Sequence, residues 1–241
     1  MTDPQKEVWD RLWEKEISYE WDSLSQTIYE VLCRTIGKMD KQRILEAGSG
    51  TGKISLRLAK DNAEVTLVDY SNNALEQSKR AFRANNLSGH FVLADIRYMP
   101  LPSGTQDVTW NAGVLEHFSE TEQLQILQEM KRVTRPGGTV LVLVPYAHCL
   151  PYRVGKAFAE EYGLWPYGQE IPTESLRDTF LAAGLKFVSE FDVGFLDSLC
   201  FLDFIPGTPT IKQYLRQWYS SLPETEKQKF PGYLLACIGK A

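Results

Sequence analysis

The sequence predicts an α/β fold, in which helices cover both faces of a mostly parallel sheet. From residue 43 onward, short apolar runs alternate with stretches whose apolar residues recur at helical spacing. A turn rich in glycine joins the first of these runs to the first helical stretch. The polar residues that stand out follow the ends of predicted strands, where ligands of parallel sheets bind. These observations together predict a ligand site at the carboxyl edge of the sheet.

Length and charge exclude several classes of function. The chain has 241 residues and a formal net charge of −5. The length suits one domain with appendages or two domains, and the charge weakens the case for non-specific nucleic-acid binding while leaving a local basic patch open. No apolar run approaches the ~18 residues of a membrane span, and the first residues lack the apolar core of a signal peptide. The four cysteines stand far apart, which favours neither disulfides nor a metal site. We therefore expect a cytoplasmic protein with no metal, no nucleic-acid partner and no membrane span.

The first 40 residues predict a helical cap. Apolar residues recur at three- and four-residue steps over residues 4–38. A polar and aromatic stretch at 18–22 interrupts this pattern, and Gly37 supplies a helix stop. We expect residues 1–40 to form the cap and residues 41–241 to form the α/β domain.

Five short apolar runs predict the first strands of the sheet, with helices between them. The runs are 44–47, 65–69, 91–95, 108–111 and 139–144. The last run is apolar on both faces, as a central parallel strand should be. Ser71 is expected to cap the helix after the second strand, and Ser119 to Glu122 has the form of a capping box before a helix that reaches Val133. Strands that alternate with helices in this way predict right-handed βαβ units.

Beyond Tyr146 the pattern loosens. The predicted elements there are a helix and two strands, over 173–183, 187–193 and 233–238. Two stretches rich in aromatic residues, 147–172 and 195–231, separate these elements and read as irregular structure. We expect them to be insertions on the substrate side of the domain.

The glycine turn runs from Glu46 to Gly52, and its glycines let the backbone approach a ligand closely. A P-loop would need a glycine five residues before Gly52 and a Ser or Thr after Lys53, and neither is present. A dinucleotide turn fits at positions 48 and 50, but its third glycine position is Lys53. Asp69 ends the second strand and would serve the ribose of a dinucleotide or of a nucleoside, so it does not discriminate between them.

Five motifs in this order resemble those of the class I S-adenosylmethionine-dependent methyltransferases, most closely the group that methylates small molecules. The motifs are Ile44 to Gly52, Val68 to Ser71, Ala94 to Ile96, Asp107 to Phe118 and Arg135 to Gly138. The resemblance covers residues 43–146. It implies a Rossmann-like seven-stranded sheet in the order 3-2-1-4-5-7-6, whose last strand runs antiparallel. It also implies S-adenosyl-L-methionine as the cofactor and methyl transfer to a small-molecule O, N or C nucleophile as the activity.

The resemblance implies a role for each position that matches a motif. Asp69 would bind both ribose hydroxyls, Glu46 would orient the ammonium group, and Asp95 would accept a hydrogen bond from the adenine amine. Tyr70 and Ile96 would sandwich the adenine ring. The other implied cofactor-binding positions lie in the glycine turn and at the end of the fourth strand: Gly48, Ser49, Gly50, Gly52, Asn111 and Ala112.

A general base is needed only where the acceptor must lose a proton. The candidates are His148, which follows the fifth strand, and His117, which we expect to be structural because family members share its motif across many substrates. Two alternatives stay open, because a fold does not establish catalysis. One is a non-catalytic, cofactor-binding or regulatory protein of the same fold, and the other is an NAD-dependent oxidoreductase. The sequence specifies neither the acceptor nor the oligomeric state.

Overall fold

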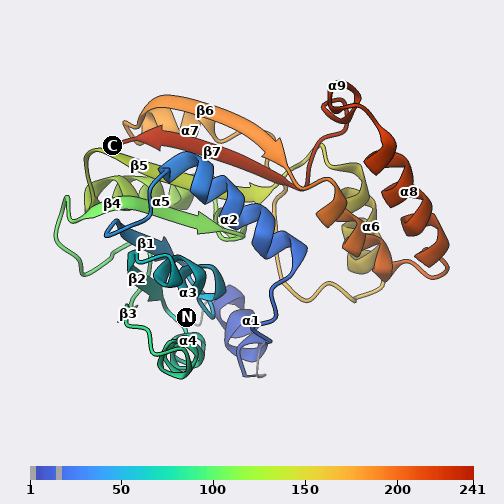
Figure 1. Ribbon diagram of the computed structural model, residues 1–241. Coiled ribbons are helices and arrows are strands. Elements are labelled where there is room, and N and C mark those ends of the chain that lie inside the picture. The colour runs from blue at the N-terminus through green and yellow to red at the C-terminus, as the bar shows by residue number, and fades with distance from the viewer. Residues whose placement is uncertain (1–3, 15–17) are drawn as a thin grey trace.

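The computed structural model describes residues 4–14 and 18–241, and these contain a seven-stranded sheet in the order β3-β2-β1-β4-β5-β7-β6. The strands are β1 (Arg43–Ala47), β2 (Glu64–Asp69), β3 (His90–Leu93), β4 (Gln106–Ala112), β5 (Thr134–Pro145), β6 (Lys186–Val193) and β7 (Leu234–Lys240). The strand β7 runs antiparallel to both of its neighbours, β5 and β6 (Figure 1). The predicted strand order and the antiparallel last strand are both confirmed.

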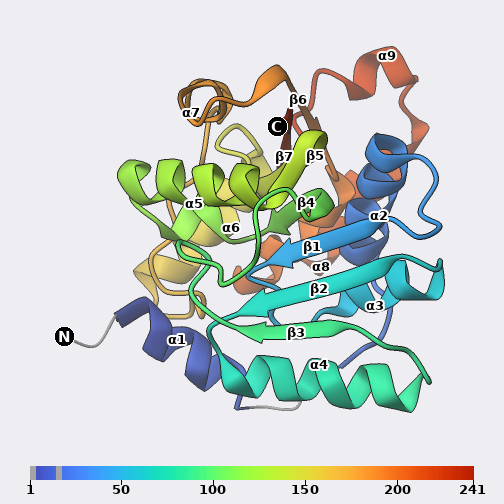
Figure 2. The ribbon, with the colours of Figure 1, turned by 90° about the vertical axis from the view of Figure 1, so that its left-hand side faces the viewer.

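Helices cover both faces of this sheet. The helices are α1 (Pro4–Leu12), α2 (Ser23–Ile36), α3 (Lys53–Lys60), α4 (Asn72–Ala84), α5 (Glu120–Val133), α6 (Leu150–Glu161), α7 (Arg177–Ala182), α8 (Pro209–Ser221) and α9 (Glu224–Lys227), with 3-10 turns η1 (Leu115–His117) and η2 (Leu196–Phe204). One face packs against α2, α3 and α4, and the other packs against α5 and α7 (Figure 2). Both predicted helix starts are confirmed, because Ser71 caps α4 and Ser119 forms a capping box with Glu122.

The two cores take alternate residues of the central strands. In β5, Leu141 and Leu143 join the core under α2 and α3, whereas Val142 and Val144 join the core under α5 and α7. Successive residues of a strand point to opposite faces, so a strand covered on both sides buries every residue. The same alternation in β4 sends Trp110 into the first core. It therefore also decides which residues of β4 can reach a site at its end.

The N-terminal segment lies in two places. Val31 and Leu32 of α2 are buried in the core of the sheet, whereas α1 lies on the side toward which the arrowheads of β1, β2 and β3 point (Figure 2). Between these helices, the hydroxyl of Tyr19 donates to the carbonyl oxygen of Thr51 over 2.7 Å. This bond fastens the segment to the glycine turn. Residues 15–17, which belong to the predicted helical stretch, lie outside the described residues.

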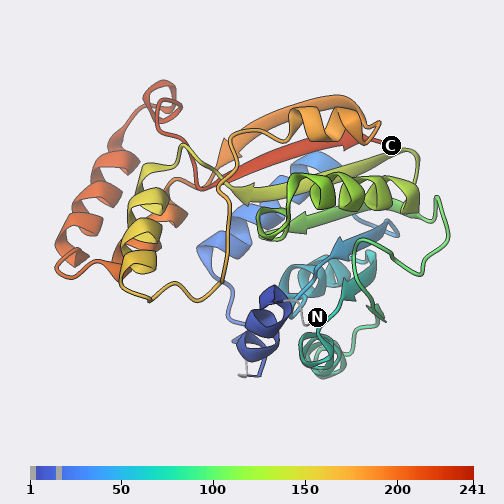
Figure 3. The same cartoon turned by 180° about the vertical axis from the view of Figure 1, so that it is seen from behind.

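The two stretches that were expected to be irregular are largely helical, so that expectation was wrong. The first contains α6 and the second contains η2, α8 and α9, and Figure 3 shows α6 and α8 beyond the carboxyl edge of the sheet. Pro151 stands in the first turn of α6, where proline is tolerated although it reads as a helix breaker in a sequence. The helix α8 buries none of its residues, so it has no buried stripe. No described helix combines the length and the hydropathy that a membrane span requires.

Candidate functional site

The glycine turn connects β1 to α3 and is held against the end of β2. The backbone N–H groups of Gly48 and Ser49 both donate to the carbonyl oxygen of Val68, over 2.8 and 3.0 Å. Gly48 has a φ of +76°, and a Cβ at this position would lie 2.9 Å from a methyl carbon of Val114. Both the backbone conformation and the close approach therefore require glycine.

Asp69 ends β2, and the glycine turn orients its carboxylate. The N–H of Gly50 donates to Oδ2 over 2.7 Å, and the N–H of Ser71 donates to Oδ1 over 2.8 Å. Burial raises the pKa of Asp69, and these backbone donors oppose the rise. A carboxylate offers about four lone-pair sites, so each oxygen can accept one more hydrogen bond. The arrangement suits a ligand with two adjacent hydroxyls.

Glu46 in β1 is a second buried carboxyl beside Asp69. It accepts a hydrogen bond of 2.5 Å from the hydroxyl of Ser55. Burial raises the pKa of Glu46 to about 8, and the charge of Asp69 acts in the same direction. Within the described part of the chain, no cation pairs with either acid. Buried acids without a counter-ion fit a ligand that carries positive charge.

Asp95 follows β3 and belongs to a network that reaches α5. Arg97 donates to it from Nε, over 3.0 Å to each oxygen, from Nη2 over 2.7 Å, and from its backbone N–H over 2.8 Å. Nη1 of Arg97 donates to Glu122, the capping-box residue of α5, over 2.6 Å. Burial acts to raise the pKa of Asp95, but the hydrogen bonds from Arg97 leave it lowered. Asp95 therefore accepts two hydrogen bonds from Arg97 on each oxygen, with the Nε–H of Arg97 shared between them.

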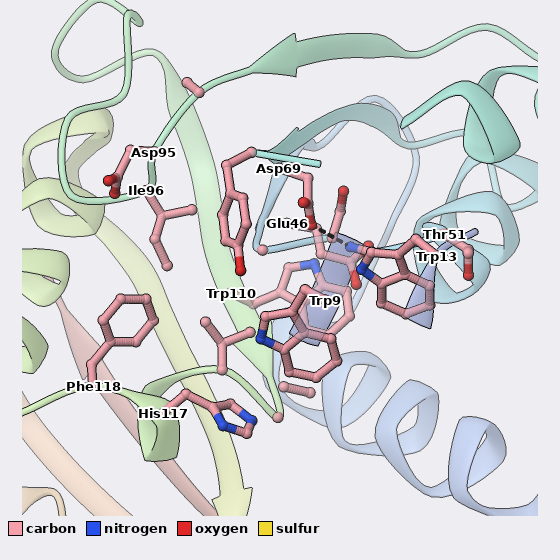
Figure 4. A pocket seen from close by; sticks show the side chains of 18 of the residues that line it. Trp9, Trp13, Glu46, Thr51, Asp69, Asp95, Ile96, Trp110, His117 and Phe118 are labelled. Carbon is pink, nitrogen blue, oxygen red and sulfur yellow. Dashed lines mark hydrogen bonds between the residues drawn. The ribbon is translucent and has the colours of Figure 1, made fainter. Parts of the chain in front are cut away.

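These carboxyl groups line one cavity of about 720 Å³. Trp9 and Trp13 also line it, with their rings stacked at a centroid distance of 5.8 Å, and Trp13 lies against Gly50 (Figure 4). Two buried polar atoms of the lining, Oγ of Ser49 and Nε1 of Trp110, have no partner among the described residues. A buried polar group without a partner costs about 1–3 kcal/mol. These two atoms therefore indicate polar groups of a ligand.

Nine of the implied cofactor-binding positions line this cavity: Glu46, Gly48, Ser49, Gly50, Asp69, Tyr70, Asp95, Ile96 and Ala112. His117, which was expected to be structural, lines the cavity as well. Gly52 does not belong to the lining. Its backbone is left-handed, and a Cβ there would lie 2.2 Å from the side chain of Leu67, so Gly52 permits close packing of α3 on β2. His148 is exposed and packs on the ring of Tyr146, away from the cavity.

The side chain of Asn111 does not lie beneath the ligand site, contrary to the expectation. It is fully buried, and its Nδ2 lies 3.6 Å from the sulfur of Met130 in α5. Alternate residues of a strand face opposite sides, so Asn111 points away from the side that Trp110 and Ala112 share. Trp110 lines the cavity instead.

The two tryptophans of the N-terminal segment were missed as site residues. The stripe that contains Trp9 and Trp13 predicted a helical cap, and their four-residue spacing places both rings on one face. That face covers the cavity. Two bulky aromatic residues on one face of a helix that precedes the glycine turn were the available signal.

Comparison with known proteins agrees with this geometry. Residues 44–138 match the family described as "Methyltransferase domain". The malonyl-[acyl-carrier protein] O-methyltransferase of Serratia marcescens is 28% identical over 149 residues, which are 62% of this chain and 56% of the relative. The ubiquinone/menaquinone biosynthesis C-methyltransferase UbiE of Vibrio parahaemolyticus is 32% identical over 112 residues, 44% of this chain and 42% of the relative. The chain thus spans about half the length of the curated relatives it matches.

Solved structures share the fold over almost the whole chain. The geranyl diphosphate C-methyltransferase from Streptomyces coelicolor A3(2), solved with Mg²⁺, geranyl diphosphate and S-adenosyl-L-homocysteine, has a TM-score of 0.68 at 13% identity and covers 99% of this chain and 98% of its own. The [4+2]-cyclase SpnF has a TM-score of 0.61 at 19% identity, and the match covers 98% of this chain and 92% of the SpnF chain. The fold and the glycine-turn site are similar to those of class I S-adenosylmethionine-dependent methyltransferases, and residues 44–138 match the methyltransferase domain family.

Proposed function

We propose that the protein transfers a methyl group from S-adenosylmethionine to a small-molecule O, N or C nucleophile. One observation carries the proposal: Glu46, Asp69 and Asp95 come from the ends of three adjacent strands and line a single cavity. An ammonium group, a ribose diol and an adenine amine are the groups that three such acids can bind. The matching domain family and the names of the relatives support the same activity.

Each acid of the cavity matches one polar group of S-adenosylmethionine. Asp69 offers one further acceptor site on each oxygen for the ribose hydroxyls, and charge-assisted hydrogen bonds are about twice as strong as neutral ones. Glu46 has no counter-ion among the described residues and would pair with the ammonium group. Asp95 would accept from the adenine amine, with Tyr70 and Ile96 on the two faces of the ring.

In methyl transfer the main task of the protein is to position the two reactants. The bound cofactor supplies a methyl group on a sulfonium, which is already an activated donor. The chain holds the reactants in place, and such positioning can supply about 7–11 kcal/mol of the barrier. Trp9 and Trp13 line the cavity with stacked rings, which would shield a bound cofactor from solvent.

A labelling experiment tests the proposed activity. The protein is incubated with cell extract from which macromolecules have been removed and with S-adenosylmethionine labelled in the methyl group. With the cofactor held near its dissociation constant for the wild type, we expect label in a small-molecule product with the wild type and far less with Asp69→Ala. If a protein that binds the cofactor transfers no label to any extract, the non-catalytic alternative replaces this proposal.

The alternatives have different support. The structural neighbour SpnF is named a [4+2]-cyclase, so this fold does not establish methyl transfer by itself. An NAD-dependent oxidoreductase is disfavoured because Lys53, at the third glycine position of a dinucleotide turn, lies next to Asp22 with its Nζ at 2.5 Å from the carboxylate. A small-molecule partner and a cytoplasmic location complete the proposal, and the latter is supported by four cysteines that are all unpaired.

A further inference from the structure

His117 stands in the cavity across from the acids that bind the cofactor. It follows β4 in η1, and its side chain is only 4% exposed. Figure 4 shows its ring on the opposite side of Trp9 and Trp110 from Glu46 and Asp69. Trp9 packs on it edge to face, with ring centroids 5.1 Å apart. The imidazole is therefore a fixed part of the wall where an acceptor can approach the methyl donor.

The hydrogen bonds of His117 define its tautomer. Nδ1 lies 2.7 Å from the carbonyl oxygen of Gln169 and 3.4 Å from the side-chain nitrogen of Gln5. The carbonyl oxygen can only accept, and it makes the shorter contact, so Nδ1 carries the proton. In a neutral ring Nε2 is then the acceptor. No hydrogen bond to Nε2 is seen from the residues that the structure describes, and Oε1 of Glu116 lies 3.9 Å away. Nε2 thus carries an unused lone pair on a side chain that is almost fully buried.

The charged groups around His117 keep this end of the cavity neutral. Burial lowers the pKa of His117, and burial raises the pKa of Glu116 well above its usual range. Lys156 of α6 also acts on His117 and disfavours the imidazolium, but its ammonium pairs with Glu160 and lies over the ring of Trp165. At neutral pH the acceptor therefore meets an uncharged imidazole.

We infer that His117 is the proton acceptor of the reaction, and that the methyl acceptor is a neutral O–H or N–H group on a planar, apolar body. This inference rests on the proposed function. As the O–C or N–C bond forms, the methyl–sulfur bond breaks with its electron pair remaining on sulfur, and the proton of the acceptor moves to Nε2 of His117. Trp9, Val114 and Phe118 supply the apolar lining for the body of the acceptor.

A carboxylate acceptor does not fit this site. It could only accept hydrogen bonds, and Nε2 of His117 has none to donate. It would also need a counter-ion, but both cationic side chains of the described lining are already paired, Lys53 with Asp22 and Arg97 with Asp95. Methylation of a carboxylate also releases no proton, so His117 would have no proton to accept.

The tautomer is measured directly by ¹⁵N NMR of histidine, because the chain has only three histidines. We use the protein saturated with S-adenosylhomocysteine and assign His117 with the variant His117→Asn. An asparagine amide can still donate to the carbonyl of Gln169 but lacks Nε2, so the variant should fold and bind S-adenosylhomocysteine within about threefold of the wild type. We expect His117 at pH 7 to be neutral with the proton on Nδ1. A proton on Nε2 would overturn the inference.

Acceptor class is tested by binding of 1-naphthol and 1-naphthoate, which share a ring system and differ in charge, to the same saturated protein. We expect 1-naphthol to bind at least tenfold more tightly than 1-naphthoate. In His117→Asn we expect the dissociation constant of 1-naphthol to rise by about 3- to 10-fold, the range for the loss of one neutral hydrogen bond. Equal or tighter binding of 1-naphthoate, or no binding of 1-naphthol, refutes the acceptor class. Failure of S-adenosylhomocysteine itself to bind refutes the proposed function instead.

Discussion

The backbone N–H of Gly50 donates a hydrogen bond of 2.7 Å to Oδ2 of Asp69. The two residues are 19 positions apart, and they join the glycine turn after β1 to the end of β2. The turn therefore has two functions: it lines the cavity, and it fixes the carboxylate that would bind the ribose. The glycine turn and the acid at the end of β2 thus form one hydrogen-bonded ligand site. For this reason the two motifs together predict the site better than either motif alone.

The first prediction concerns Asp69. Asp69→Ala removes a charged acceptor from the ribose position, and hydrogen bonds to charged groups contribute about 1.5–3 kcal/mol. We expect the dissociation constant of S-adenosylhomocysteine to rise by roughly 10- to 150-fold, measured by isothermal titration. Asp40→Ala, at a surface acid that pairs with Lys38, is the matched control and should bind as the wild type does. An unchanged dissociation constant in Asp69→Ala would remove Asp69 from the site.

The second prediction couples cofactor binding to a proton. The pKa of Glu46 is about 8, so Glu46 is mostly protonated at pH 7, and an ammonium group beside it would favour the ionised form. Binding of S-adenosylhomocysteine should therefore release a proton, and the affinity should fall as the pH is lowered from 8 to 6. Titrations in phosphate and in Tris should give different heats for the wild type and equal heats for Glu46→Gln. Equal heats for the wild type would contradict the assignment of Glu46.

The third prediction concerns stability of the protein without ligand. Glu46 has an unfolded pKa near 4.5 and a folded pKa of about 8. Between these values unfolding releases the proton that the folded state holds, so this contribution to stability is full below about pH 4.5 and is lost as the pH rises through 8. Glu46→Gln lacks this loss and should become more stable than the wild type by at least about 1 kcal/mol at pH 8.5, because one pKa unit corresponds to about 1.4 kcal/mol. Urea unfolding of both proteins at pH 5 and pH 8.5 measures the difference, which should shrink at the lower pH.

The fourth prediction separates backbone strain from packing at Gly52. Gly52 and Gly163 have nearly the same φ, +64° and +66°, but a Cβ at Gly52 would lie 2.2 Å from Leu67, whereas a Cβ at Gly163 meets nothing within 4 Å. Gly163→Ala should cost about 1–2 kcal/mol for the left-handed backbone. Gly52→Ala should lower the free energy of unfolding by about 1–3 kcal/mol more than Gly163→Ala does, because the core around Leu67 must shift. Thermal unfolding of both variants gives the comparison, and equal losses would show that the packing of Leu67 adapts freely.

Much of the fold could be predicted because the parallel strands are apolar on both faces. Val140 to Val144 read as a central strand, and Asp69 and Asp95 read as strand ends, so the motifs placed the carboxyl edge of the sheet correctly. The helices α6 and α8 were missed for a physical reason. Pro151 stands in the first turn of α6 although it resembles a breaker, and the buried side of α6 includes Gly155 and Lys156, which are not apolar core residues. The helix α8 buries none of its residues, so it lacks the periodic burial that marks a helix.

The sequence predicted the cavity residues that lie in the glycine turn or carry a charge. It missed the residues that reach the cavity through tertiary packing. Glu46 and Asp69 stand at fixed places relative to the turn. Trp9 and Trp13 reach the cavity only because α1 folds back over the glycine turn, and this long-range contact has no local signature. The alternation along β4 could have excluded Asn111, because a strand that turns Ala112 toward the cavity must turn Asn111 away.

The central claim is that the cavity binds S-adenosylmethionine, and isothermal titration with S-adenosylhomocysteine tests it most directly, with NADH as the control titrant. We expect one molecule of S-adenosylhomocysteine to bind per chain with micromolar affinity, and NADH not to bind. Binding of NADH alone to the folded protein would contradict the account and would assign the glycine turn to a dinucleotide.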